Sequence, residues 1–256
     1  MEAIIQLNGV FKNYGVKKVL KGIYLNIYPG QVIGYIGPNG AGKSTTVKIL
    51  TGLITDYDGE VLIGGIDLKQ DPIAIKRKIG YVPELAELYD VLTPREFLGF
   101  MANLYELPTT VAAERIEKML AAFGLQEVID ARMETFSKGM KQKVLITSGI
   151  LHNPEILILD EPLSGLDANS VIIVKELISK LAKEGKTVFY CSHMMDVVEK
   201  VSDRIVLIHE GVVIADGTIE ELKQQKGNAS LENIFSQLTA TESLNKAADH
   251  LISAFE

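Results

Sequence analysis

Three glycines, one lysine and two hydroxyl residues lie close together in the stretch GPNGAGKST, residues 37–45. An apolar run, QVIGYIG, precedes it, and a segment with helical patterning follows it. Glycines allow the backbone to wrap closely around an anion with its N–H groups pointing inward, and a helix N-terminus favours negative charge. This spacing in this context predicts a phosphate-binding loop rather than a glycine turn with an incidental lysine. Its residues are Gly37, Pro38, Asn39, Gly40, Ala41, Gly42, Lys43, Ser44 and Thr45.

The polar side chains of this loop suit a nucleoside triphosphate with Mg²⁺. Lys43 is expected to place its ammonium group on the β- and γ-phosphates, and the Ser44 hydroxyl is expected to bind the metal. Thr45 adds a further donor. The sequence therefore predicts ATP and Mg²⁺ as cofactors.

Two acids, Asp160 and Glu161, end the apolar run in ILILDEP, residues 156–162. In an open parallel sheet, ligands bind at the carboxyl ends of the strands, so both side chains are expected beside the phosphate loop. We expect Asp160 to hold Mg²⁺ through water and Glu161 to act as general base for the attacking water. A merely solvated strand end is the alternative, and the phosphate loop in the same sheet argues against it.

The elements that position these residues alternate between strands and helices, which predicts an α/β fold. Strands are expected within residues 3–36, 59–67, 78–84, 156–160 and 186–193, and a hairpin at 203–217. Helices are expected at 44–53, within 93–123 with a break at Pro108, and at 137–152, 170–185 and 218–227. The α/β body, residues 1–83 and 154–216, thus carries an inserted helical block at 84–153. Near the end, residues 244–255 form an apolar stripe that suits docking on the body or pairing with another copy.

Composition narrows the class of protein. The 256 residues have a formal net charge of −7, which gives no global electrostatic case for nucleic-acid binding. The single cysteine, Cys191, excludes an intrachain disulfide. We find no signal-peptide pattern and no run of 18 apolar residues, so we expect a membrane span, where one is needed, to come from another chain.

Taken together, these motifs resemble the nucleotide-binding domain of ATP-binding cassette (ABC) transporters. GPNGAGKS resembles the Walker A motif, ILILDEP the Walker B motif, and SGLD, residues 164–167, the D-loop. YVPE, residues 81–84, lies where the family has its Q-loop, and FSKGMKQKV, residues 136–144, lies where it has the LSGGQ signature. The resemblance implies a P-loop NTPase with a RecA-like core sheet, an N-terminal antiparallel β subdomain and an inserted α-helical subdomain. It covers residues 1–225, and residues 226–256 remain as a C-terminal helical extension.

The resemblance implies roles for three further residues, each of which has a simpler alternative. Tyr14 matches the aromatic residue that stacks on adenine, but an aromatic residue at a strand end is also ordinary. His193 resembles the switch histidine near the γ-phosphate, although a lone histidine at a strand end is often only polar. Asp167 is implied to communicate across a cassette dimer, and it also suits an N-cap of the helix beginning near Ala168.

Two positions depart from the family pattern. Glu84 replaces the Q-loop glutamine, so a third acid is expected near the other two, with unusual Mg²⁺ affinity and pH dependence. In the signature, Lys138 and Met140 replace a glycine and a glutamine. Ser137 and Gly139 keep the hydroxyl and the close backbone approach, and in the family they bind the γ-phosphate held by a second cassette. Lys138 and Lys141 are candidates to attract the phosphates held by that second cassette. The alternative for this stretch is a plain N-capped helix.

The resemblance implies an ATP-hydrolysing subunit that drives transport by a separate integral membrane permease, with export favoured. The implied partners are that permease and a second cassette, identical or different, and the implied location is the inner face of the cell membrane. Apolar residues within 84–107 suit either local core or a groove for the permease. The alternative function is an ABC-family ATPase acting on ribosomes or DNA, but the second cassette and charged linker usual in that class are not found. A small-molecule kinase does not account for the D-loop or the signature.

Overall fold

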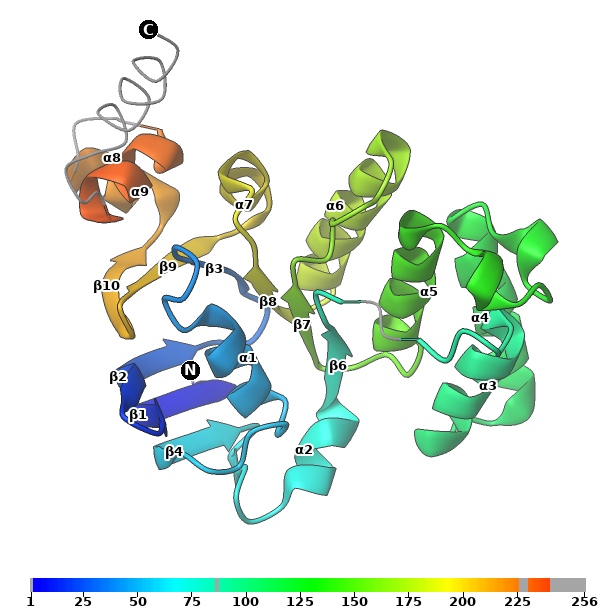
Figure 1. Cartoon of the computed structure of the whole chain (residues 1–256), viewed down its shortest axis with the longest axis horizontal. Helices are drawn as coiled ribbons and strands as arrows, with labels where there is room; N and C mark the ends of the chain where they lie inside the picture. Colours follow the sequence, from blue (N-terminus) through cyan, green and yellow to red (C-terminus); the bar gives the residue numbers. More distant parts are fainter. Residues whose placement is uncertain (1, 86–87, 226–229, 240–256) are drawn as a thin grey trace, which may run out of the picture.

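The computed structural model describes residues 2–85, 88–225 and 230–239 of the chain, and within them it contains two sheets (Figure 1). The first is antiparallel, with strand order β2-β1-β4-β5. Its strands are β1 (Ile5–Tyr14), β2 (Lys17–Ile27), β4 (Asp58–Ile63) and β5 (Ile66–Asp67). Buried and exposed residues alternate along most of β1 and β2, as expected where one face of a sheet packs on the core.

The second sheet has six strands in the order β10-β9-β3-β8-β7-β6. Its strands are β3 (Val32–Ile36), β6 (Ile79–Val82), β7 (Ile156–Asp160), β8 (Thr187–Cys191), β9 (Arg204–His209) and β10 (Val212–Gly217). The neighbours from β9 to β6 are parallel, and β10 pairs antiparallel with β9. Every residue of β3, β7 and β8 is buried, so these central strands are covered on both faces.

The two faces of β7 belong to two different hydrophobic cores. Ile156 and Ile158 pack in a core with the antiparallel sheet and with α1 (Lys43–Leu50). Leu157 and Leu159 pack in a core with α6 (Ala168–Lys183), α7 (Met195–Val201) and the helical block. Because successive strand side chains alternate between faces, one short strand separates the two layers.

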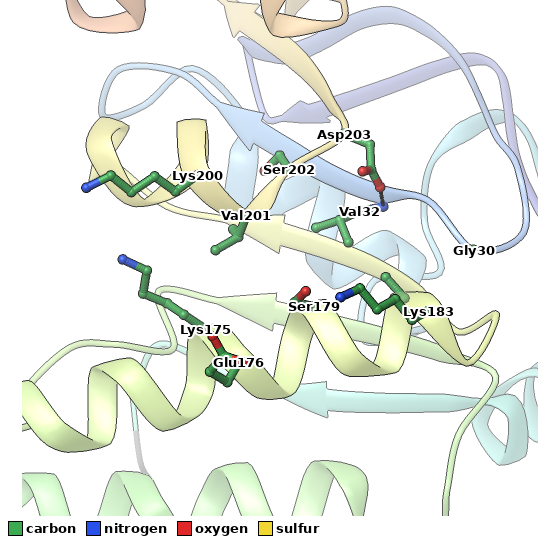
Figure 2. Close-up of a pocket in the computed structure, with 11 residues that line it drawn as sticks. Gly30, Val32, Lys175, Glu176, Ser179, Lys183, Lys200, Val201, Ser202 and Asp203 are labelled. Carbon is green, nitrogen blue, oxygen red and sulfur yellow. Dashed lines mark hydrogen bonds between the residues drawn. The ribbon is translucent and has the colours of Figure 1, made fainter.

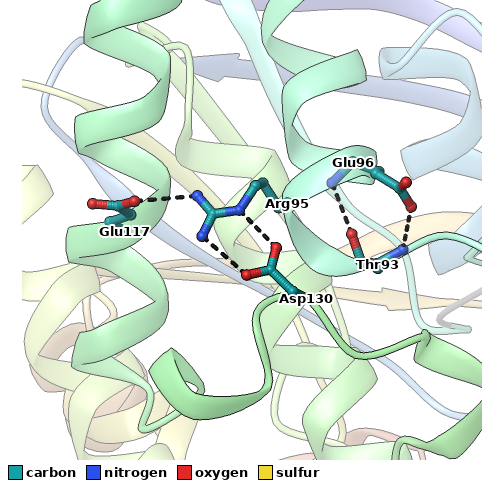
Figure 3. Close-up of polar contacts among 5 residues, drawn as sticks. All are labelled: Thr93, Arg95, Glu96, Glu117 and Asp130. Atoms are coloured by element: carbon teal, nitrogen blue, oxygen red, sulfur yellow. Dashed lines mark hydrogen bonds and ion pairs between the residues drawn. The ribbon is translucent and has the colours of Figure 1, made fainter.

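The helical block is formed by α3 (Pro94–Leu104), α4 (Thr109–Ala122) and α5 (Lys138–Ile150), which lie together on the right of Figure 1. A capping box begins α3: Glu96 N–H donates to Thr93 Oγ1, and Thr93 N–H donates to the Glu96 carboxylate. Figure 3 shows Arg95, at the start of α3, in contact with Glu117 of α4 and with Asp130 of the loop that follows α4. Its Nε lies 2.7 Å from Asp130 Oδ1, and its Nη1 lies 3.1 Å from Glu117 Oε1.

The fold predicted from the sequence, an α/β P-loop NTPase with an antiparallel sheet and inserted helices, is confirmed. The sequence did not reveal α2 (Pro72–Lys78) or α7, because seven residues are too few for a clear helical period. Asp71 caps α2, with Pro72 in its first turn. Two helices follow the hairpin, α8 (Ile219–Gln225) and α9 (Leu231–Thr239), whereas the apolar stripe at 244–255 lies outside the described residues. Among the described residues, no helix is both long enough and apolar enough to cross a bilayer.

Candidate active site

The phosphate loop connects β3 to α1 through a backbone that only glycine suits at two points. Gly42 caps α1 at φ 114°, in the left-handed region. A Cβ on Gly37 would lie 2.3 Å from the Ile208 carbonyl oxygen of β9, which leaves no room for a side chain. The loop therefore follows the sheet edge closely and directs the first turn of α1 toward solvent at the carboxyl end of β3.

The Lys43 side chain hydrogen-bonds to the backbone at the start of this loop. Its Nζ donates to the carbonyl oxygens of Gly37 at 2.6 Å and Pro38 at 3.2 Å. Below it, Thr46 Oγ1 donates to the Gly42 carbonyl and lies 3.1 Å from the Tyr35 hydroxyl, whose pKa burial raises well above its ordinary value. The loop is thus held by side chains of its own helix and strand.

A hollow of about 440 Å³ lies directly over the loop. One wall comes from the first hairpin, with Tyr14, Lys17 and Val19, and the other from the loop and α1. The loop and helix residues that line it are Asn39, Gly40, Gly42, Lys43, Ser44 and Thr45. The Tyr14 side chain is half exposed there, although β2 and β3 separate it from the loop in sequence.

The acid pair lies at the carboxyl end of β7, two strands from β3 in the sheet. Asp160 is only 4% exposed. Burial raises the pKa of Asp160, and the negative charges of Glu84 and Glu161 raise it further, while the Cys191 thiol and Lys43 act in the opposite direction. Glu84, just after β6, is therefore close enough to interact with Asp160, as the sequence predicted.

Glu161 is fixed in an unusual position. Its φ of 48° is in the left-handed region, and its N–H donates to the Cys191 carbonyl at 2.9 Å. Its Oε2 accepts a hydrogen bond from the Ser192 hydroxyl at 2.9 Å, and its Oε1 lies 2.8 Å from His193 Nδ1. The carboxylate is 12% exposed and the imidazole 73% exposed. Both partners come from the loop after β8, so the structure brings together two of the predicted catalytic residues.

The signature stretch begins α5 in the way the sequence predicts. Ser137 is the N-cap, and its hydroxyl accepts from Met140 N–H at 3.3 Å. All three lysines of this stretch have partners within the chain. Lys138 Nζ donates to Ser164 Oγ at 2.8 Å, Lys141 Nζ contacts both Asp90 oxygens at 2.7 and 2.8 Å, and Lys143 Nζ lies 2.9 Å from Asp167 Oδ2. None of the described residues 136–144 lines the hollow over the phosphate loop.

Comparison with known proteins is consistent with this arrangement. The family model described as "ABC transporter" matches residues 20–164, more than half of the chain. The chain belongs to the ABC transporter family. It is 38% identical to the linearmycin resistance ATP-binding protein LnrL of Bacillus subtilis over 89% of this chain and 73% of that protein. It is 36% identical to the ABC transporter ATP-binding protein NatA of the same organism over 86% of this chain and 90% of that one.

Solved structures give the same relationship. An ATP-binding subunit of an ABC transporter superposes with a TM-score of 0.88 at 32% identity, covering 93% of this chain and all of that one. A dimer of the ATP-binding cassette MJ0796, in a post-hydrolysis state with ADP and Pi, gives a TM-score of 0.78 at 28% identity, covering 84% and 98%. The chain is accordingly an ABC ATPase with the cassette fold.

The D-loop aspartate of this cassette has the local role that its position suggests. Asp167 accepts from Ser170 N–H at 2.9 Å and caps α6, and its Oδ2 lies 2.9 Å from Lys143 Nζ. The Lys143 ammonium, followed by the Ser170 donors, holds the pKa of Asp167 well below its usual range. The capping alternative is therefore present in the isolated cassette.

Sequence reasoning missed Ser192, which hydrogen-bonds Glu161, and Lys17 and Val19, which line the hollow. Ser192 directly follows a fully buried strand, and that position at a carboxyl end was the available signal.

The cassette has a second hollow, of about 500 Å³, between α6 and α7, with Lys175, Lys183 and Lys200 on its walls (Figure 2). Gly30 and Asp203, near the amino ends of β3 and β9, line it too, so it is not at the ligand-binding edge of the sheet.

Proposed function

We propose that this cassette hydrolyses Mg²⁺-bound ATP and couples its turnover to export by a separate membrane subunit. The observation that carries the catalytic part is the Glu161 carboxylate, held between Ser192 and His193 at the sheet edge that also presents the phosphate loop. Family membership supports ATP hydrolysis, and the names of LnrL and NatA support a transporter subunit, with resistance as the stated role of LnrL.

ATP is proposed to occupy the hollow over the phosphate loop. The Tyr14 ring stacks on the adenine, and stacking of an aromatic side chain on a base contributes about 1 kcal/mol or more. The backbone N–H groups of residues 39–45, which include the first turn of α1, surround the phosphates. The Lys43 ammonium, now bound to two carbonyls of the same loop, exchanges those partners for the β- and γ-phosphates.

The residues present fit a magnesium ion that arrives with the nucleotide. Asp160 is a carboxylate whose pKa is raised first by burial and then by the charges of Glu84 and Glu161, and a bound cation favours its ionised form. Among the described residues, no group of three or more His, Cys, Asp or Glu side chains is arranged to hold a metal alone. This fits Mg²⁺, which keeps several waters and takes few protein ligands beside phosphate. Ser44, Asp160 and Glu84 are the proposed ligands, and the ion would neutralise charge developing on the phosphates.

Glu161 is the proposed general base. The hydrogen bond from Ser192 and the contact with His193 aim its carboxylate and leave it little freedom to rotate. His193 contacts Glu161 and is largely exposed, so we propose that it also contacts the γ-phosphate. We therefore assign Glu161 and His193 to catalysis and Glu84 and Asp167 to supporting roles at the metal and at the dimer contact.

A second cassette is proposed to complete the site. Ser137 and Gly139 lie outside the hollow that the phosphate loop of the same chain forms, so in this chain they serve no nucleotide of their own. We propose that they bind the γ-phosphate of the ATP held by another copy. The dimeric structure of MJ0796 with ADP and Pi supports such an assembly. Two ATP molecules would then lie between two head-to-tail cassettes.

A permease is proposed to bind beside the segment after β6. Five large apolar side chains between this segment and α3 are exposed: Leu85, Tyr89, Val91, Phe100 and Leu104. Phe97 is buried, so the apolar residues at 84–107 divide between core and surface. We propose that these exposed side chains contact the permease, which would place the cassette on the inner face of the cell membrane. The solved structure of cbiO1 from Clostridium perfringens, which is 26% identical with a TM-score of 0.75, is described as part of the ABC transporter complex cbiONQ.

Co-purification tests this function. The tagged chain is isolated from detergent-solubilised membranes and, separately, from the unsedimented fraction, and bound proteins and nucleic acids are identified. We expect an integral membrane protein to co-purify and to stimulate ATP hydrolysis. Recovery only with ribosomes or nucleic acid would support the alternative function instead, which the net charge of −7 and the transporter relatives do not favour.

A further inference from the structure

One face of α5 lies along the segment that connects the catalytic glutamate to α6. Gly139 lies so close to this segment that a Cβ on it would be 2.5 Å from the Gly165 carbonyl oxygen. Lys138, the residue before it, bonds Ser164, and Gln142 and Lys143 contact Pro162 and Asp167 respectively. Positions 138, 139, 142 and 143 share one helix face by their spacing, so a single helix surface contacts residues 162–167 from end to end.

Lys138 covers the centre of this contact. Gly165 has φ 79°, and a Cβ there would lie 3.1 Å from both Cγ and Cδ of Lys138. The aliphatic part of the lysine thus lies over the glycine turn, while its Nζ donates to the Ser164 hydroxyl at 2.8 Å. Long lysine side chains pack their methylene groups in this way and keep the charge at the surface.

The far end of the contact is buried and leads back to the catalytic residue. Gln142 is fully buried, and its Nε2 donates to the Pro162 carbonyl at 3.0 Å. Pro162 directly follows Glu161, whose backbone is in the left-handed region. These contacts connect the start of α5 both to the turn 164–167 and to the peptide after Glu161.

We propose that Lys138 is a positioning residue, which holds the turn Ser164–Asp167 against the signature helix through Ser164, rather than a ligand for the phosphates of the second cassette. The proposal rests on the proposed ATPase cycle, because its consequence is that closure on a neighbour's ATP moves the signature and the D-loop turn as one unit. The lysine at this position supplies a tie between the two segments that a glycine, the family's residue there, has no side chain to make.

A double-mutant cycle separates positioning from phosphate attraction. Lys138→Met keeps the aliphatic chain and removes the ammonium, Ser164→Ala removes its partner, and Lys180→Met on α6 is a control for loss of one exposed lysine. All three positions are at the surface or close to it, so folding is expected to be unaffected. Steady-state ATP hydrolysis at saturating ATP and binding of a fluorescent ATP analogue are measured for each variant and for Lys138→Met/Ser164→Ala.

We expect Lys138→Met to lower kcat about three- to tenfold, with ATP affinity unchanged, as for the loss of one charge-assisted hydrogen bond. In the Ser164→Ala background it should have no further effect, and Lys138→Arg, which keeps a donor, should recover most of the loss. An equal loss in both backgrounds, or a loss that disappears at about 0.5 M salt, would instead show that Lys138 acts by its charge on phosphate and would overturn the proposal.

Hydrogen exchange of the nucleotide-free chain gives a readout that does not require hydrolysis. Lys138→Met and Ser164→Ala should each speed amide exchange in residues 163–168, and Lys180→Met should not. Unchanged exchange in both variants overturns the positioning role. A wild-type chain without ATPase activity would contradict the proposed function, yet the exchange result would still decide whether Lys138 holds the turn.

Discussion

Replacement of Glu161 by glutamine tests the catalytic assignment most directly. Both carboxylate oxygens have partners, Oε1 with His193 Nδ1 at 2.8 Å and Oε2 with the Ser192 hydroxyl at 2.9 Å. Glutamine has the same shape and keeps one oxygen, and its NH2 group can donate to the Ser192 hydroxyl or to an unprotonated His193 Nδ1. At most one contact is therefore lost, at a cost of about 1 kcal/mol in stability. The substitution should add no backbone strain, because glutamine and glutamate adopt the Glu161 φ of 48° equally well.

The catalytic cost should be much larger. An amide does not accept a proton from water at neutral pH, and a positioned general base contributes about 10²- to 10⁴-fold. Turnover of Glu161→Gln should therefore fall by this factor, or about 3 to 5 kcal/mol in the barrier. ATP affinity should stay within about twofold of wild type, since Glu161 does not line the hollow over the phosphate loop.

The assay combines phosphate release at saturating ATP, binding of a fluorescent ATP analogue, and light scattering to detect an ATP-dependent dimer. Glu210→Gln is the matched control, because Glu210 also has a positive φ, 45°, but lies in the exposed turn between β9 and β10. We expect Glu161→Gln to bind ATP and to persist as a dimer. Turnover within about threefold of wild type would remove Glu161 from the role of base, and equal loss of ATP binding would show that it supports the fold instead.

Three further changes follow from the same structure. Tyr14→Ala should weaken ATP binding about five- to tenfold in a fluorescence titration, as stacking is lost. Tyr24→Ala should not, because Tyr24 is a strand tyrosine that is more exposed, 70% against 50%, and does not line the hollow. Glu84→Gln should keep hydrolysis but shift its Mg²⁺ titration, because one charge near Asp160 is removed; an unchanged titration contradicts direct coordination. His152, stacked on Tyr105, has its pKa lowered from 6.5 to about 4 by burial, so as pH falls through this range the unfolded chain binds a proton that the folded chain does not. Stability should therefore decrease by at most about 3 kcal/mol, reduced by solvent screening at the half-buried ring, and His152→Gln should lose this part of the pH dependence in denaturant unfolding.

Much of the site was predictable because its chemistry lies in short contiguous stretches. The phosphate loop needs only the nine residues 37–45 between a strand and a helix, and the structure has β3 and α1 there. The caps at Ser137 and Asp167 bond N–H groups three residues ahead, at Met140 and Ser170, so their spacing is local. The order of strands and helices likewise followed from periodicity, except for the seven-residue helices α2 and α7.

The signature lysines show what local reasoning did not reach. From the sequence, Lys138 and Lys141 were candidates to attract a neighbour's phosphates. In the structure their partners are Ser164, 26 residues away, and Asp90, 51 residues away. Separations of 26 and 51 residues do not correspond to any helix or strand period, so the sequence pattern could not predict these partners. They follow only from the packing of α5 against the turn after β7 and against the start of the helical block.

The sequence by itself determined which residues are candidates to bind phosphate, hold a metal and accept a proton, because backbone conformation and side-chain chemistry are local. The tertiary structure decided how those residues meet. Parallel pairing of Asp160 with Cys191 places the ends of β7 and β8 together, and this register alone brings Ser192 and His193 onto Glu161 across 31 and 32 residues of chain. Such contacts depend on strand order and register, which hydrogen bonding and core packing fix over the whole sheet rather than in any one segment.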